Sequence, residues 1–267
     1  MCGGIGGFKG SVSLFDFTTE RIKWIVSSAH SKIVNAIDGC SIGSAELVSG
    51  SGDGSVKVWD PRVSDPVITI DAAQENMDCW AVSYGNCIDQ GDRVVVAGYD
   101  NGSLHLIDLR TTKVRWETKM RKGVCHVSFD RKDIPMNKLA VVCLEGELAV
   151  YDMRTYNNES GFAGLAIPVS KSTLWGCHFL PQDRETMAVT SGSGEMFLYR
   201  YSYPPQRSMR DDKGHEVGIV GSLECIGKSD VASSRPLISF DWNKGKKGLF
   251  ITATLDQVLT AGICSNI

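Results

Sequence analysis

The sequence predicts an all-β fold, a propeller built from repeated units of four short strands. Three observations support this prediction. A tight turn followed by a strand returns about every 45 residues, which is a spacing typical of propeller blades. Apolar residues alternate within the strands, as they do in half-buried β-structure. No segment shows a long helical pattern, and 42% of the 267 residues are hydrophobic, which is enough for a packed core.

The repeat is clearest at residues 50–62, where Asp53-Gly54 forms a predicted turn and Val56 and Val58 alternate in the strand that follows. Glycine accepts the positive φ of such a turn, and aspartate tolerates it. Two β-rich runs precede each turn and another follows the strand, so each unit predicts four strands. The other copies lie at residues 10–16, 98–110, 145–154, 193–199 and, in degraded form, 254–258.

The strand count predicts an incomplete propeller. The chain opens on one terminal strand and continues with five units of four strands, about five and a half blades within a single domain of residues 1–267. Closure of the ring matters because an open propeller leaves sheet edges unpaired. We therefore expect the chain to be truncated at its N-terminus relative to a complete ring.

The dipeptide Trp59-Asp60 indicates the WD type of repeat, and Ala29-His30 stands where such repeats usually carry Gly-His. In this type a histidine, a strand serine, a turn aspartate and a strand tryptophan form a buried hydrogen-bonded set. A buried carboxylate and a buried indole both need partners, so the role of the set is predicted to be structural rather than that of a catalytic triad. The corresponding residues here are His30, Ser49, Asp53 and Trp59.

Composition argues against several classes of protein. A net charge of −3 and a pI near 6.0 give no basic surplus for nucleic acid. The nine cysteines are odd in number and widely spaced, without a Cys-x-x-Cys pair, so neither a disulfide framework nor a zinc ribbon is expected. Free thiols and the lack of a signal-peptide pattern favour the cytoplasm.

The sequence predicts no enzyme and no cofactor. Residues 50–54 resemble a glycine-rich phosphate loop, but they lead into a strand, whereas phosphate loops open a helix. No close cluster of metal ligands such as His-Glu-x-x-His occurs, so no metal ion is expected. No apolar run reaches the roughly 18 residues of a membrane span. Proteins remain as the expected partners.

Specific blocks of sequence resemble the WD repeat-containing protein 92 family, also known as Monad. The most specific block is residues 129–139, and residues 78–80, 97–102, 171–175, 203–208 and 255–257 add to it. The resemblance implies a seven-bladed propeller that acts as a cytoplasmic co-chaperone and as a monomer within a larger complex. It further implies work with the RuvB-like ATPase complex, its TPR and PIH subunits and prefoldin-like subunits, with axonemal dynein heavy chains as clients.

Two features are candidates for protein binding. Trp80 and Trp175 occupy equivalent positions at the start of the innermost strand of their units, and tryptophan is enriched among binding hot spots. Packing between blades is the alternative. The stretch 201–217, which carries Arg207 and Arg210, lengthens its repeat by about 15 residues, and long insertions are usually functional or disordered.

An Asp-x-Arg sequence follows the strand in three successive repeats and favours a different function. It resembles the docking motif of substrate receptors for cullin-RING ubiquitin ligases. In the alternative interpretation each arginine pairs with a nearby aspartate at the blade edge, where such surface pairs contribute little stability. The arginines concerned are Arg62, Arg110 and Arg154.

Overall fold

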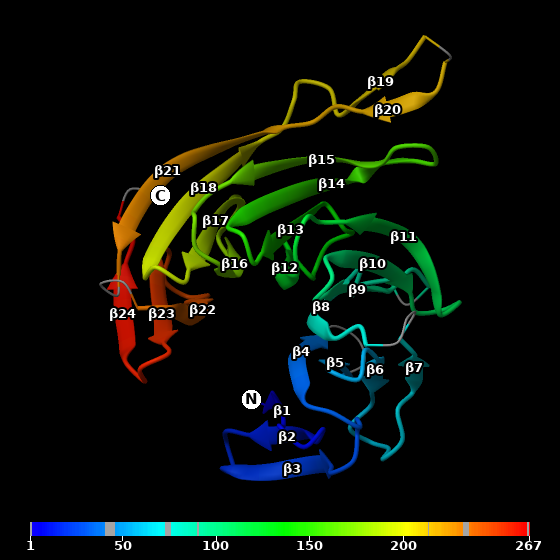
Figure 1. The fold of residues 1–267 in the computed structure, drawn as a ribbon, viewed down its shortest axis with the longest axis vertical. Helices are drawn as coiled ribbons and strands as arrows, with labels where there is room; N and C mark the ends of the chain where they lie inside the picture. Colours follow the sequence, from blue (N-terminus) through cyan, green and yellow to red (C-terminus); the bar gives the residue numbers. More distant parts are fainter. Residues whose placement is uncertain are drawn as a thin grey trace. The chain divides into compact units, whose positions relative to one another are not determined.

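The computed structural model describes residues 2–40, 46–72, 76–89, 91–212, 214–231, 235–265 and 267. Throughout these ranges the chain forms antiparallel β-strands and turns without any helix, so the all-β prediction is confirmed (Figure 1). It follows that no helix in the described ranges is long and apolar enough to cross a membrane. The chain groups into two compact units, Met1–Val127 with Lys132–Pro135, and Ser128–Arg131 with Met136–Ile267.

The first unit contains three antiparallel sheets in which each strand pairs with the next one along the chain. The first sheet has three strands, and the other two have four. Their strands are β1 (Cys2–Gly6), β2 (Val12–Asp16) and β3 (Arg21–Val26); β4 (Val34–Cys40), β5 (Glu46–Ser51), β6 (Val56–Trp59) and β7 (Ile68–Ile70); β8 (Cys79–Gly85), β9 (Val94–Tyr99), β10 (Ser103–Asp108) and β11 (Lys113–Lys119).

Three further sheets and one inserted hairpin follow along the chain. Their strands are β12 (Val124–Phe129), β13 (Lys138–Cys143), β14 (Glu147–Asn157) and β15 (Gly161–Pro168); β16 (Leu174–Leu180), β17 (Asp183–Ser191), β18 (Glu195–Ser202) and β21 (Ser222–Asp230); β22 (Leu237–Trp242), β23 (Leu249–Thr254) and β24 (Leu259–Ile263). The hairpin β19 (Ser208–Arg210) and β20 (Glu216–Gly218) is inserted between β18 and β21.

The six sheets are propeller blades, and the predicted strand count is wrong at both ends of the chain. The first sheet has three strands rather than one terminal strand, and the last sheet has three rather than four. Strand β1 carries glycine at three of its five positions, so it lacks the apolar alternation that indicates a strand. The single domain of residues 1–267 stays a prediction.

The core lies between neighbouring sheets. In the first unit Val58 of one sheet and Tyr84 and Val95 of the next belong to one buried cluster. In the second unit Val150 packs in a cluster with Met187, on the same principle. Because the faces of the sheets are buried against one another, the strand ends and loops remain for recognition.

The turn between β13 and β14 requires glycine. At Gly146 φ is +74°. Its carbonyl oxygen accepts the backbone N–H groups of Val169 at 2.8 Å and Ser170 at 3.3 Å. A Cβ atom at this position would collide with the carbonyl oxygen of Ser170. The turn and the loop that leads into β16 are therefore fitted to each other at backbone level.

We expect Gly146→Ala to lower the free energy of unfolding by about 2–3 kcal/mol, because it combines backbone strain with a backbone collision. Urea denaturation measures this loss. Gly214→Ala is the matched control, since Gly214 also has a positive φ, of +81°, but nothing lies within 4 Å of its Cβ position. Equal losses in the two variants would contradict the collision.

Candidate protein-binding surface

The structure brings the four residues of the predicted set together beside β5 and β6. Nε2 of His30 lies 2.7 Å from Oγ of Ser49, and the indole N–H of Trp59 donates to the same oxygen at 2.8 Å. Nδ1 of His30 lies 3.3 Å from a carboxylate oxygen of Asp53. His30 and Trp59 are 4% and 1% exposed, which favours a structural role over catalysis.

Ser55 is a fifth member of this network that the sequence analysis did not include. Its hydroxyl donates to Asp53 at 2.6 Å and lies 2.9 Å from Nδ1 of His30. Burial acts to raise the pKa of Asp53, but the Ser55 hydroxyl and the backbone N–H groups of Ser31 and Ser55 outweigh it and hold this pKa well below its usual value. The repeat in the sequence could have indicated Ser55, because a serine follows the turn glycine in the next copy as well, at Gly102-Ser103.

The protonation of His30 predicts a pH dependence of stability. Burial lowers the pKa of His30 below 6.5, and the charge of Asp53 offsets this only in part. Just below pH 6.5 the unfolded chain therefore binds more protons than the folded chain, so stability falls as the pH decreases from 7.5 to 5.5. Burial lowers the pKa of His105 as well, so a residual slope belongs to that residue.

Thermal unfolding at several pH values measures this slope. His30→Gln keeps a polar side chain without the titration, so we expect it to reduce the dependence of Tm on pH between 7.5 and 5.5. An unchanged slope in this variant would show that His30 does not titrate differently in the folded and unfolded states.

Trp80 and Trp175 share a backbone feature that the sequence did not reveal. The pairing register shifts between Cys79 and Ala81, and again between Leu174 and Gly176, so each tryptophan is the extra residue of a β-bulge. A bulge redirects a side chain away from the regular alternation of its strand. Trp80 is half-buried, whereas Trp175 is 40% exposed.

The three Asp-x-Arg sequences share one local hydrogen bond. The carboxylates of Asp60, Asp108 and Asp152 accept the backbone N–H of the arginine two residues later, at 2.9, 2.8 and 3.1 Å. The three arginines are exposed; Arg62 and Arg110 follow β6 and β10, whereas Arg154 lies within β14.

The side chains of these arginines differ in their partners. Arg62 donates through Nε and Nη2 to Asp60, which lowers the pKa of that carboxyl to about 2. Within the described residues Arg110 and Arg154 form no side-chain hydrogen bond or ion pair. The geometry therefore leaves two of the three guanidinium groups open to a partner.

Arg207 anchors the inserted hairpin. Its guanidinium donates to the amide oxygen of Asn137 at 3.0 Å from both terminal nitrogens, and lies 4.0 Å from the ring centre of Tyr203. Its Nε is 3.6 Å from the buried carboxylate of Asp152. Arg210, by contrast, is exposed on β19.

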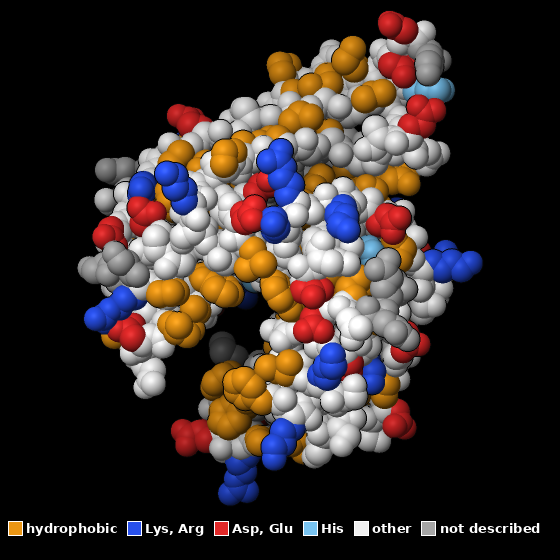
Figure 2. Space-filling model, in the orientation of Figure 1, with side chains coloured by type: hydrophobic (Ala, Val, Ile, Leu, Met, Phe, Trp, Pro, Cys, Tyr) orange, Lys and Arg blue, Asp and Glu red, His pale blue; other side chains and the backbone are white. Residues whose placement is uncertain are grey.

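The hairpin consists of the two paired strands β19 and β20. The alternative of a disordered insertion is therefore wrong for its described residues. Lys213, at the tip of the same stretch in the sequence, lies outside the described residues. Asn157 at the end of β14 donates to the carbonyl oxygen of Glu216 on β20 at 2.6 Å. Figure 2 shows acidic side chains near the tip of this projection. The hairpin presents charged groups while its base is fixed.

We expect Arg207→Gln to loosen the hairpin and to lower stability by about 1–3 kcal/mol, because it leaves the buried Asp152 carboxylate without its cation. Limited proteolysis within residues 203–221 should become faster. Arg210→Gln is the matched control on the same hairpin and should leave both measurements unchanged. Equal cleavage rates for all three proteins would count against the anchor.

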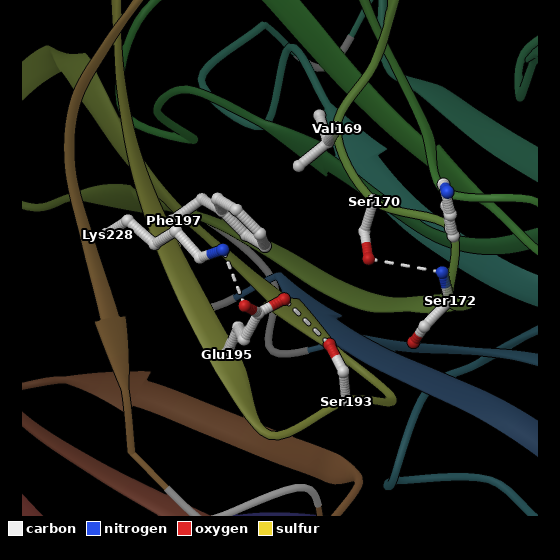
Figure 3. A pocket seen from close by; sticks show the side chains of 8 residues that line it. Val169, Ser170, Ser172, Ser193, Glu195, Phe197 and Lys228 are labelled. Atoms are coloured by element: carbon white, nitrogen blue, oxygen red, sulfur yellow. Dashed lines mark hydrogen bonds and ion pairs between the residues drawn. The ribbon is translucent and has the colours of Figure 1, made fainter.

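A groove of about 450 Å³ lies on the second unit, and we name it the Ser170 groove (Figure 3). The loop Val169–Ser172 forms one wall, and Ser193, Glu195, Phe197 and Lys228 line the rest of it. On that second side Lys228 pairs with Glu195 at 2.5 Å, and the hydroxyl of Ser193 donates to the other carboxylate oxygen at 2.9 Å. These two hydrogen bonds lower the pKa of Glu195.

Comparison with known proteins identifies similar chains. The chain is 42% identical over 271 residues to dynein axonemal assembly factor 10 of Chlamydomonas reinhardtii, and 42% identical over 270 residues to the human protein of that name. Both alignments cover 98% of this chain and 75% of the relative. No protein-family model matches the chain.

A crystal structure of the computationally designed protein Ika8 shares the fold, with a TM-score of 0.66 at 14% identity, over 98% of this chain and 67% of the designed one. The two natural relatives confirm the resemblance to WD repeat-containing protein 92, which is another name for the same assembly factor.

Proposed function

Because this chain belongs to the dynein axonemal assembly factor 10 family, we propose that it is a non-catalytic scaffold that binds other proteins during the assembly of axonemal dynein. The observation that supports this most strongly is the 42% identity over 98% of the chain to relatives of that name. The fold is consistent with the proposal, because the faces of its sheets are buried against one another and its loops are exposed for binding.

The proposed partners are those that the family resemblance implies. They are the TPR-containing and prefoldin-like subunits of the RuvB-like ATPase co-chaperone complex, with dynein heavy chains as clients in the cytoplasm. The protein is proposed to act there as a monomer within a larger complex, and the complete propeller of its family is proposed to have seven blades.

A chimera tests the proposal. The aligned region of the Chlamydomonas relative is replaced by this chain, and the chimera is expressed in cells that lack the assembly factor. We expect axonemal dynein arms and swimming to return. A stable, folded chimera that restores neither, beside the intact relative that restores both, would contradict the proposal.

The alternative function is that of a substrate receptor for a cullin-RING ubiquitin ligase. The exposed side chains of Arg110 and Arg154, which lack hydrogen bonds and ion pairs within the described residues, favour this alternative. Pull-down of the ligase adaptor from cell extract tests it. The alternative predicts capture by the unmodified chain and loss of capture when Arg62 and Arg110 are replaced by alanine.

A further inference from the structure

The Ser170 groove has hydrogen-bond acceptors that are already used and donors that are not. Both carboxylate oxygens of Glu195 are occupied, one by Lys228 and one by Ser193. On the opposite wall the hydroxyl of Ser170 accepts the backbone N–H of Ser172 at 3.1 Å. Figure 3 shows these two sets of side chains on facing sides of the groove. The Glu195 carboxylate is therefore already paired with a cation and a hydroxyl.

Three donors on or next to the loop that carries Ser170 have no partner among the described residues. The hydroxyl of Ser172 is buried and makes no hydrogen bond, which is costly for a polar atom shielded from water. Lys171 is exposed and forms no ion pair, and the indole N–H of Trp175 is also without a hydrogen bond. All three belong to the loop that leads into β16 or to the bulge at its start.

The hydroxyl and the indole flank the same short stretch of backbone. A Cβ atom built on Gly192 would lie 3.1 Å from the Ser172 hydroxyl oxygen and 3.3 Å from Nε1 of Trp175. The bulge that directs Trp175 out of its strand thus brings its N–H to the turn that also carries Ser193. Lys171 and Ser172 line the groove, and the indole N–H of Trp175 lies beside it, next to Ser172 and the turn of Ser193.

A ligand for this end must supply acceptors and negative charge. A carboxylate fits, because its charged oxygens can accept from an ammonium group, a hydroxyl and an indole N–H. Such charge-assisted hydrogen bonds are stronger than hydrogen bonds between neutral groups. Val169 and Phe197 add apolar wall beside it, with Lys228 held 5.2 Å from the Phe197 ring centre. A side chain next to the carboxylate can therefore be apolar.

We propose that the Ser170 groove binds an extended acidic segment of a partner protein, whose Asp or Glu side chain accepts from Lys171, Ser172 and Trp175. The proposal rests on the scaffold function above and adds the chemistry of the segment that is recognised. Tryptophan at the edge of a groove, with satisfied groups around it, has the composition of a binding hot spot.

Fluorescence anisotropy tests the proposal with two labelled synthetic peptides. One alternates Glu with Ser around a central Leu, and the other has Gln in place of each Glu. We expect the acidic peptide to bind at least about ten-fold more tightly, and added salt to weaken it, because the interaction is partly ionic. Equal affinities for the two peptides would overturn the proposal.

Variants locate the binding site. Lys171→Glu should weaken the acidic peptide by about ten-fold or more, and Ser172→Ala and Trp175→Ala by several-fold each. Lys244→Glu is the matched charge reversal on an exposed turn outside the groove and should leave affinity unchanged. If Lys171→Glu binds as tightly as the unmodified protein, the groove is not the site.

The chimera separates this proposal from the proposed function. If the unmodified chimera restores dynein arms while the acidic peptide does not bind, the groove proposal fails and the scaffold function stands. If the peptide binds in the groove but no chimera restores dynein arms, the scaffold function fails instead. If both hold, Lys171→Glu in the chimera should reduce the recovery of dynein arms, and full recovery would overturn the role of the groove.

Discussion

Replacing Lys138 by methionine is expected to lower the free energy of unfolding by about 3–5 kcal/mol, the largest single effect that we predict. The Lys138 side chain is fully buried, and its ammonium group lies 3.1 Å from the equally buried carboxylate of Asp130. It also donates to the hydroxyl of Tyr203 at 2.5 Å. Methionine fills similar volume, so the loss reports on the charge and not on a cavity.

The cost arises because Asp130 would remain as a buried charge without its cation. The amide of Asn137 and the backbone N–H groups of residues 131 and 138 still donate to it, but hydrogen bonds do not neutralise a carboxylate. Removing both charges should therefore restore part of the stability. The double variant Lys138→Met with Asp130→Asn tests this, since coupled residues give less than the sum of their separate losses.

Urea denaturation of the four proteins of this cycle gives the coupling. Lys246→Met, on an exposed turn of the same unit, is the control and should change stability by less than about 0.5 kcal/mol. A loss below about 1 kcal/mol for Lys138→Met would mean that water or another group replaces the ammonium, and the buried pair would not be a determinant of stability.

Ser49→Ala is expected to lower the free energy of unfolding by about 2–3 kcal/mol, less than Lys138→Met and as much as Gly146→Ala. The hydroxyl of Ser49 is the shared partner of His30 and Trp59, and all three residues are buried. Its loss leaves a ring nitrogen and an indole N–H unsatisfied away from water. The volume removed is that of one oxygen atom, so lost packing contributes little.

Urea denaturation with an unchanged m-value would measure this loss as one of stability alone. Ser64→Ala is the matched control, because Ser64 is exposed and makes no hydrogen bond within the described residues. If both variants unfold at the same urea concentration, the hydrogen bonds around Ser49 contribute nothing measurable.

The sequence predicts best those features that depend on neighbouring residues. The turn at Asp53-Gly54 and the alternation of Val56 and Val58 need only local chemistry, and the structure has β6 where they predict a strand. Strand β1 cannot be predicted in this way, because its glycines interrupt the alternation of apolar and polar residues. It is recognised as a strand only by its pairing with β2.

The candidate sites are harder to predict because they depend on contacts between distant parts of the chain. Arg207 reads as a free binding arginine in the sequence, but it is held by Asn137, which is 70 residues away. The bulge at Trp175 is a property of how β16 pairs with β17, and no single strand records it. The Ser170 groove likewise needs a loop, a turn and two strands together.

The strand-start bulge has a consequence for how this protein can diversify. The same register shift occurs in four of the sheets, and the extra residue is Asn35, Trp80, Trp175 or Ile238. An amide, two indoles and an aliphatic chain thus occupy one geometric slot. Because this residue is not paired in the strand ladder, sheet pairing does not restrict which amino acid stands there. A point mutation at this position can therefore change the surface chemistry of one blade and leave the pairing of its strands unchanged.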